Sequence, residues 1–125
     1  VGEPKAFETR SGVKYRLIIE EFGGWDLFQK LLAVLHEIAK KHETDIGTIA
    51  SAYILHQPAV TAVIVGARNR EHLNSNLRIP GIKFTEQELH NLKNITSLAK
   101  GPKGPVYYLE RYDSKHRTIM HTNNN

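Results

Sequence analysis

The chain has 125 residues, of which 40% are hydrophobic and 24% charged, and this composition predicts one compact soluble domain. It contains no cysteine, which excludes disulfides and thiol catalysis. No apolar run approaches the roughly 18 residues of a membrane helix, and no signal-peptide or lipidation pattern is visible, so we expect a cytoplasmic protein without a membrane partner. The net charge of +4 suits an anionic ligand. Lys and Arg are scattered and do not alternate with aromatic residues, so we expect no nucleic-acid partner.

The first 24 residues predict a loop followed by one short helix. Residues 1–12 contain two glycines and a proline but few large apolar side chains, which is typical of a loop. Residues 14–22 mix apolar and charged side chains and end at Gly23-Gly24, as a short helix stopped by glycine would. The chain opens at Val1 rather than at methionine, and we expect the sequence to continue upstream.

From residue 25 onward the sequence becomes periodic. Apolar side chains recur at steps of three and four along one face of a predicted helix: Leu27, Phe28, Leu31, Leu32, Leu35, Ile38 and Ala39. A second helix can be capped by Thr44 or Asp45. It ends before Pro58, because proline has no backbone N–H to donate.

Thr61 to Val65 forms a short, β-branched apolar run before Gly66, which predicts a strand buried on both faces. Such a strand needs parallel neighbours, and the chain supplies no second convincing strand. Its backbone N–H and C=O groups would be costly to bury unpaired. The strand therefore pairs with another chain or with the sheet of a longer protein, and we favour the longer protein.

Two further helices and a tail follow the predicted strand. Asn69 can cap a helix that runs to about Ile79, and Thr85 with Glu88 forms a capping box that opens another helix. Residues 101–125 begin with a Gly- and Pro-rich break and are expected to form an irregular C-terminal tail. The isolated chain is thus predicted to be mainly α, with four to five helices and one or two short strands.

Five short segments between residues 38 and 76 follow one another in a characteristic order. They are Ile38-Ala-Lys-Lys-His42, Ile46-Gly-Thr-Ile-Ala50, Tyr53-Ile-Leu-His-Gln-Pro58, Val63-Ile-Val-Gly-Ala-Arg68 and Glu71-His-Leu-Asn-Ser-Asn76. Together they resemble the last βα unit of the aldo-keto reductases, and weaker matches extend over nearly the whole chain. The resemblance implies that the chain is the C-terminal part of a (β/α)8 TIM barrel. It also implies an oxidoreductase that transfers hydride between NADP(H) and a carbonyl or alcohol substrate. Residues 25–100 would hold the last helical and βα units, with a cofactor-binding segment at 61–77.

The residues of that segment have the chemistry of an anion site. The N-terminus of the helix after the strand offers free N–H groups and a positive dipole end. Gly66 would allow close backbone approach, and Arg68 could bind a phosphate in a bidentate way. His72 lies in the first turn, and Asn76 follows four residues later with an amide that could pair with an adenine edge. This order suits the adenosine 2′-phosphate end of NADP(H).

The resemblance assigns cofactor binding to six positions: Gly66, Ala67, Arg68, Asn69, His72 and Asn76. Two of them depart from the common pattern of the family, in which many members have Lys in place of Gly66 and Arg or Gln in place of His72. Arg68 could replace the lost lysine charge, whereas a neutral histidine is the weaker phosphate ligand. As a rival interpretation, Arg68 and Asn69 are only a solvated turn and a helix cap.

The resemblance also implies what the chain lacks. The family's catalysis uses a Tyr general acid with a Lys, an Asp and a His, all carried on earlier strands and loops. No residue of this chain matches those positions, and a closed barrel needs roughly 250 residues. We therefore expect the chain to be inactive alone and to act as part of a full-length enzyme.

Two other classes of function compete with the enzyme hypothesis. The first is a truncated, non-enzymatic helical module that binds a partner or a nucleotide. The apolar surface left by the missing barrel would favour its self-association. The second is a basic helical RNA-binding domain, whose binding would depend steeply on salt. The histidine spacings do not fit paired ligands on one helix face, so no metal site is predicted.

Overall fold

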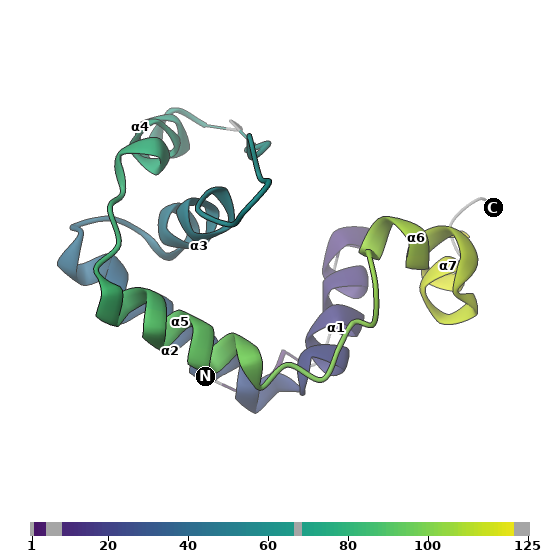
Figure 1. Ribbon diagram of the computed structural model, residues 1–125. Helices are drawn as coiled ribbons and strands as arrows, with labels where there is room; N and C mark the ends of the chain where they lie inside the picture. Colours follow the sequence, from purple (N-terminus) through teal and green to yellow (C-terminus); the bar gives the residue numbers. More distant parts are fainter. Residues whose placement is uncertain (1, 5–8, 67–68, 122–125) are drawn as a thin grey trace. The chain divides into compact units, whose positions relative to one another are not determined.

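The computed structural model describes residues 2–4, 9–66 and 69–121, and these residues are mainly helical (Figure 1). Their elements, in order, are α1 (Arg10–Phe22), α2 (Trp25–Lys41), α3 (Ile46–Leu55), α4 (Arg70–Arg78), the 3-10 turn η1 (Ile79–Gly81), α5 (Glu86–Ser97), α6 (Val106–Tyr112) and α7 (Ser114–His121). The predicted mainly-α class is confirmed, although the described residues hold more helices than the four to five expected. The chain divides into two compact units, residues 31–95 and residues 1–30 with 96–125.

The core of the 31–95 unit is built from the apolar faces that the sequence periodicity predicted. Leu35, Ile38 and Ala39 of α2 form one buried cluster with Ile49 of α3 and Leu92 of α5. Ile49 and Leu92 are fully enclosed, with 0% of their surface exposed. Burying a side chain of this size contributes about 1.5–3 kcal/mol, so this cluster is the main apolar stabilisation of the unit.

The helices of the 31–95 unit begin where the sequence placed their caps. Asp45 accepts the backbone N–H of Thr48 at 2.7 Å and caps α3. At α5, Glu88 N–H donates to Thr85 Oγ1 at 3.2 Å, and Thr85 N–H donates to the Glu88 carboxylate at 2.9 Å. This reciprocal pair is the capping box that the sequence indicated. Each cap satisfies donors that a helix start would otherwise leave unpaired.

The 1–30 and 96–125 unit joins α1 to the C-terminal helices. Thr9 caps α1 by accepting Gly12 N–H at 3.0 Å, and α1 ends at Gly23, whose φ of +147° favours glycine. In α7, His116 is 4% exposed, and its Nε2 lies 3.0 Å from the Glu21 carboxylate of α1. Lys14 of α1 forms an ion pair with Glu110 of α6. Side-chain contacts of this kind connect the two ends of the chain.

The expectation of an irregular tail was wrong for residues 106–121. They form α6 and α7, which pack on each other, and α7 packs on α1. The Asp113 carboxylate supplies the missing start signal, because it accepts the N–H groups of Lys115 and His116 at 3.0 and 3.2 Å. Short helices of this type are stabilised by tertiary contacts more than by sequence propensity, which explains why the sequence pattern did not reveal them.

The predicted strand at Thr61 to Val65 is also absent. The segment 60–66 is extended but belongs to no strand or helix, and Ile64 is fully exposed. Among the described residues, no backbone–backbone hydrogen bond involves residues 61–66. A strand is defined by pairing, and nothing in the described part of the chain pairs with this segment. The prediction of a buried strand is therefore wrong for the described residues.

Candidate functional site

The candidate site surrounds the N-terminus of α4, which follows the extended segment. Asn69 is the N-cap, and its Oδ1 accepts the backbone N–H of His72 at 3.0 Å. The first turn of a helix has four N–H groups without intrahelical partners, and this cap satisfies one of them. The other N–H groups of the first turn and the positive end of the helix dipole can face an anion. Asn69 therefore has a structural role as the cap, in addition to the predicted cofactor contact.

The structure describes four of the six predicted cofactor-binding residues. Ala67 and Arg68 lie outside the described residues. Gly66 is exposed, and a side chain added there would meet nothing within 4 Å, so its backbone is accessible. Asn76 donates its side-chain amide Nδ2–H to the carbonyl of Gly66 at 2.9 Å. The structure thus brings Gly66 and Asn76 together, and Asn69 and His72 together.

A hollow of about 680 Å³ lies beside α4 on the side of His72. It is lined by His36, Thr44, Asp45, Ile46, Gly47, His72 and Ser75. The sequence analysis missed all of these residues except His72. The signal that could have found them is Gly47 in the first turn of α3, because a glycine there leaves open a surface that a side chain would cover.

The walls of this hollow are linked by hydrogen bonds between α3 and α4. Thr48 Oγ1–H donates to the backbone carbonyl of Ser75 at 3.3 Å. A hydrogen bond from the Ser75 side chain is the main cause that lowers the pKa of Asp45, and the backbone N–H of Thr48 adds to this effect against the opposing influence of burial. Asp45 is therefore ionised at neutral pH. Its negative charge disfavours a phosphate directly beside it, so a neutral ring fits this part of the hollow better than an anion.

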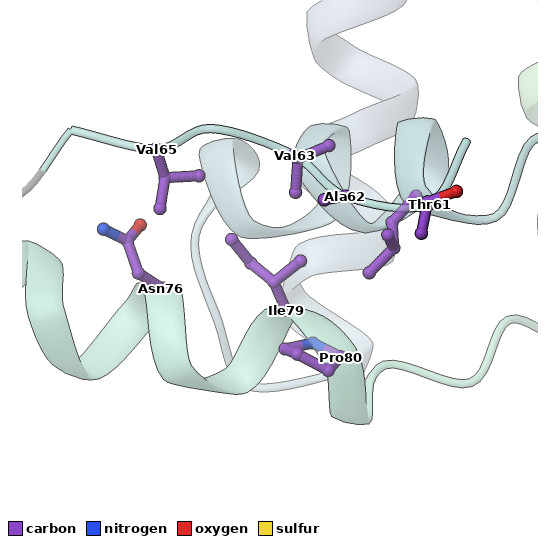
Figure 2. Close-up of a pocket in the computed structure, with 8 residues that line it drawn as sticks. Thr61, Ala62, Val63, Val65, Asn76, Ile79 and Pro80 are labelled. Carbon is purple, nitrogen blue, oxygen red and sulfur yellow. The ribbon is translucent and has the colours of Figure 1, made fainter.

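A second hollow, of about 280 Å³, lies between the extended segment and the C-terminal half of α4 with η1 (Figure 2). Its lining is mainly apolar: Leu55, Thr61, Ala62, Val63, Val65, Asn76, Ile79 and Pro80. Figure 2 shows Asn76 rising from α4 towards the segment near Val65, while Ile79 points into the space below Val63. Apart from Asn76 and Thr61, the lining offers no polar side chain to a ligand, so the hollow is a packing surface more than a polar binding site.

Neither a metal-ligating cluster nor a membrane-spanning helix is present among the described residues. No three of their His, Asp and Glu side chains converge closely enough to hold a metal ion. None of the helices in the described ranges combines the length and the apolar character that crossing a bilayer requires. The chemical features of the site are therefore a helix N-terminus, an exposed imidazole and two hollows on either side of α4.

A sequence model of the aldo/keto reductase family matches residues 2–97, which is most of the chain. The chain therefore belongs to the aldo/keto reductase family, and its helices correspond to part of the (β/α)8 barrel of that family. The family resemblance that the five segments indicated is confirmed. No solved structure matches the chain.

Three curated proteins are similar to parts of the chain. It is 31% identical over 102 residues to an aldo-keto reductase of Strobilurus tenacellus, covering 79% of this chain and 29% of that protein. It is 28% identical over 65 residues to an aryl-alcohol dehydrogenase of Pestalotiopsis microspora, covering 52% of this chain and 17% of that protein. It is 29% identical over 58 residues to the norsolorinic acid reductase of Aspergillus flavus, covering 46% of this chain and 15% of that protein. The chain thus spans less than a third of the length of each of these relatives.

Proposed function

We propose that this chain is part of an NADP(H)-dependent oxidoreductase and that it supplies the site for the adenosine 2′-phosphate end of the cofactor. The observation that carries the proposal is the N-terminus of α4, where a capped helix start adjoins a hollow wide enough for a purine. The phosphate would be held by backbone N–H groups after Gly66, by Arg68 and by His72. The bound cofactor would supply the hydride that the reaction transfers.

The adenine ring would occupy the hollow beside His72. Gly47 and Ser75 line opposite sides of it, on α3 and α4, and no large side chain stands at position 47 to block the face of a base. The anionic Asp45 in the same wall favours a neutral ring with exocyclic N–H donors over a second phosphate. A base in this hollow and a phosphate at the helix start would lie about one helical turn apart.

The chemistry at the substrate is inferred from the family and from the names of the relatives. An aryl-alcohol dehydrogenase and a reductase are among them, so we propose that the substrate is a carbonyl compound or the corresponding alcohol. The Tyr, Lys, Asp and His that catalyse the reaction would come from the portion of the barrel that this chain does not span. The chain alone would bind nucleotide without turning over substrate, and we propose a cytoplasmic location for the enzyme.

The test is a calorimetric titration of the chain with 2′,5′-ADP, which carries the 2′-phosphate and adenine but no nicotinamide. We expect 2′,5′-ADP to bind at least tenfold more tightly than 5′-AMP, because each charge-assisted hydrogen bond to the phosphate contributes about 1.5–3 kcal/mol. His72→Ala should reduce this preference, and His90→Ala, an exposed histidine on α5, is the matched control. Equal affinity for the two nucleotides would contradict the proposal, as would NADPH oxidation by the chain alone.

A non-enzymatic interaction module is the second candidate, and one observation favours it. Exposed apolar side chains gather on the extended segment and on α3 and α4: Ile54, Ile64, Val65, Leu73 and Leu77. Clusters of this kind on a protein surface mark contact sites. In this alternative the chain would bind a partner or a second copy of itself through residues 61–65, and a failure to bind any adenine nucleotide would favour it.

A further inference from the structure

The extended segment is attached to α4 at a single polar point. Among the described residues, the only hydrogen bond that involves residues 61–66 joins Asn76 Nδ2–H to the carbonyl of Gly66, at 2.9 Å. The two residues are ten positions apart in sequence, so the bond closes a loop that contains the start of α4. Elsewhere the segment faces α4 and η1 across the second hollow, mainly with apolar side chains such as Val63 and Val65 opposite Ile79 (Figure 2). Apolar contacts alone would let the segment shift along α4, whereas a hydrogen bond fixes its position.

The geometry also determines which atom of the Asn76 amide makes the bond. The Gly66 carbonyl can only accept a hydrogen bond, so the amide nitrogen must face it. The amide oxygen, Oδ1, receives no hydrogen bond from any described residue. The side chain is half-buried and rises from the last turn of α4, whose backbone holds it. A rigid donor of this kind can hold the backbone of a neighbouring segment in place.

We propose that Asn76 is a positioning residue that fixes the carbonyl of Gly66 against α4 and so holds Gly66 in place beside the proposed phosphate site. The inference rests on the proposed nucleotide site and assigns this residue a role beyond contact with the base. Without this bond, Gly66 would be free to move relative to the helix start. Affinity for the 2′-phosphate would then fall, because part of the binding free energy would be needed to order the segment.

The substitution Asn76→Asp removes the donor and preserves the shape of the side chain. Aspartate has nearly the same shape as asparagine, but it cannot donate to the Gly66 carbonyl. Asn74→Asp is the matched control, since it places the same charge on an exposed position of the same helix. Measurements in about 1 M salt limit the Debye length to about 3 Å and suppress the difference in long-range repulsion between the variants.

The readout is the gain in affinity that the phosphate provides, measured as the ratio of the dissociation constants of adenosine and adenosine 2′-phosphate. We expect the ratio to be about tenfold lower in Asn76→Asp than in Asn74→Asp. Loss of the hydrogen bond leaves the Gly66 carbonyl unpaired, and such a loss typically lowers an equilibrium constant by about this factor. Adenosine itself should bind both variants equally. Equal ratios in the two variants would overturn the proposal, and so would a loss confined to adenosine binding, which would make Asn76 a reader of the base.

A second measurement keeps the proposed nucleotide site and the positioning role separable. NMR order parameters of the backbone amides of residues 61–66 need no ligand. If the unmodified chain binds neither nucleotide, the nucleotide site is wrong, and the positioning role is then judged by the order parameters alone. Lower order parameters near Gly66 in Asn76→Asp than in Asn74→Asp would support it. Equal order parameters in the two variants would refute it.

Discussion

At the scale of single residues, Glu88 shows how one side chain serves two helix ends. Its carboxylate accepts Thr85 N–H at the start of α5 and lies 3.1 Å from His42 Nε2 after the end of α2. Burial raises the pKa of Glu88, but the N–H of Thr85 and the neighbouring imidazole outweigh this effect and hold the pKa below its ordinary value of 4.5. Only 3% of the residue is exposed. The carboxylate therefore contributes to stability in its charged form.

This arrangement predicts how the stability of the chain responds to acid. Because the folded-state pKa of Glu88 is lowered, its contribution is complete above pH 4.5 and is lost as the pH falls through the folded-state value. Glu88→Gln keeps the capping box but cannot titrate. In the unmodified chain, the free energy of unfolding measured with urea should fall as the pH is lowered from 5. We expect a smaller fall in Glu88→Gln. In Glu86→Gln, a substitution in the same turn of α5, the free energy of unfolding should fall as much as in the unmodified chain. An identical dependence of the free energy of unfolding on pH in all three proteins would refute the prediction.

At the scale of elements, the sequence predicted those helices that carry a cap or a periodic apolar face. α2, α3, α4 and α5 lie where the pattern placed them: α2 by its apolar face, and α3, α4 and α5 with Asp45, Asn69 and Thr85 at their starts. The helices of the tail were missed because their stability comes from contacts with α1, ninety residues earlier in the chain. The segment 61–65 was read as a strand because its residue types favour one, but pairing depends on a partner that local sequence does not contain.

The candidate site was predictable to the extent that it depends on local chemistry. The cap at Asn69 follows directly from residue type and position. The bond between Asn76 and Gly66 depends on how the segment 61–66 lies against α4, and the hollow lined by Gly47 and Ser75 depends on how α3 packs against α4, so local spacing could not reveal them. The predicted contacts of Ala67 and Arg68 with the cofactor remain predictions.

The end of α2 depends on a residue of α4 as well. Arg78 donates from Nη2 to the carbonyl of His42 at 2.7 Å and from Nη1 to the carbonyl of Glu43. Carbonyls after a helix end have no intrahelical donors, and a guanidinium there also complements the helix dipole. We expect Arg78→Met to lower the free energy of unfolding by about 1–2 kcal/mol. Arg70→Met, at the other end of α4, should change it by less than about 0.5 kcal/mol in the same urea titration; equal losses would contradict this assignment.

At the scale of the whole molecule, the chain belongs to a barrel family and exposes large apolar side chains on the segment 61–66 and on α4. Ile64 is fully exposed, and Leu77 is 72% exposed. Residues 58–66 carry no charged side chain, although the chain as a whole has a net charge of +4. Two copies can therefore approach each other along this stretch without repulsion between cations.

We accordingly expect the isolated chain to self-associate through this stretch. Ile64→Lys should weaken association more than tenfold, since burial of an isoleucine contributes about 1.5–3 kcal/mol and two lysines would repel. At concentrations low enough for the chain to be monomeric, it should leave the unfolding midpoint unchanged because the side chain is fully exposed. Leu98→Lys, at another exposed apolar position, is the matched control in sedimentation velocity over a series of concentrations. Association that responds equally to both substitutions would place the contact elsewhere.

The exposed, extended stretch between α3 and α4 has a consequence for the lifetime of the chain. Proteases bind their substrates as extended peptides, and exposed connections without backbone partners are the preferred places of cleavage. A cut within residues 61–66 would separate α1 to α3 from α4 to α7 covalently, yet α3 would still contact α4 and η1. The nicked chain would keep much of its packing but would lose the connection to the start of α4, so cleavage here would abolish the proposed phosphate site before it unfolded the helices.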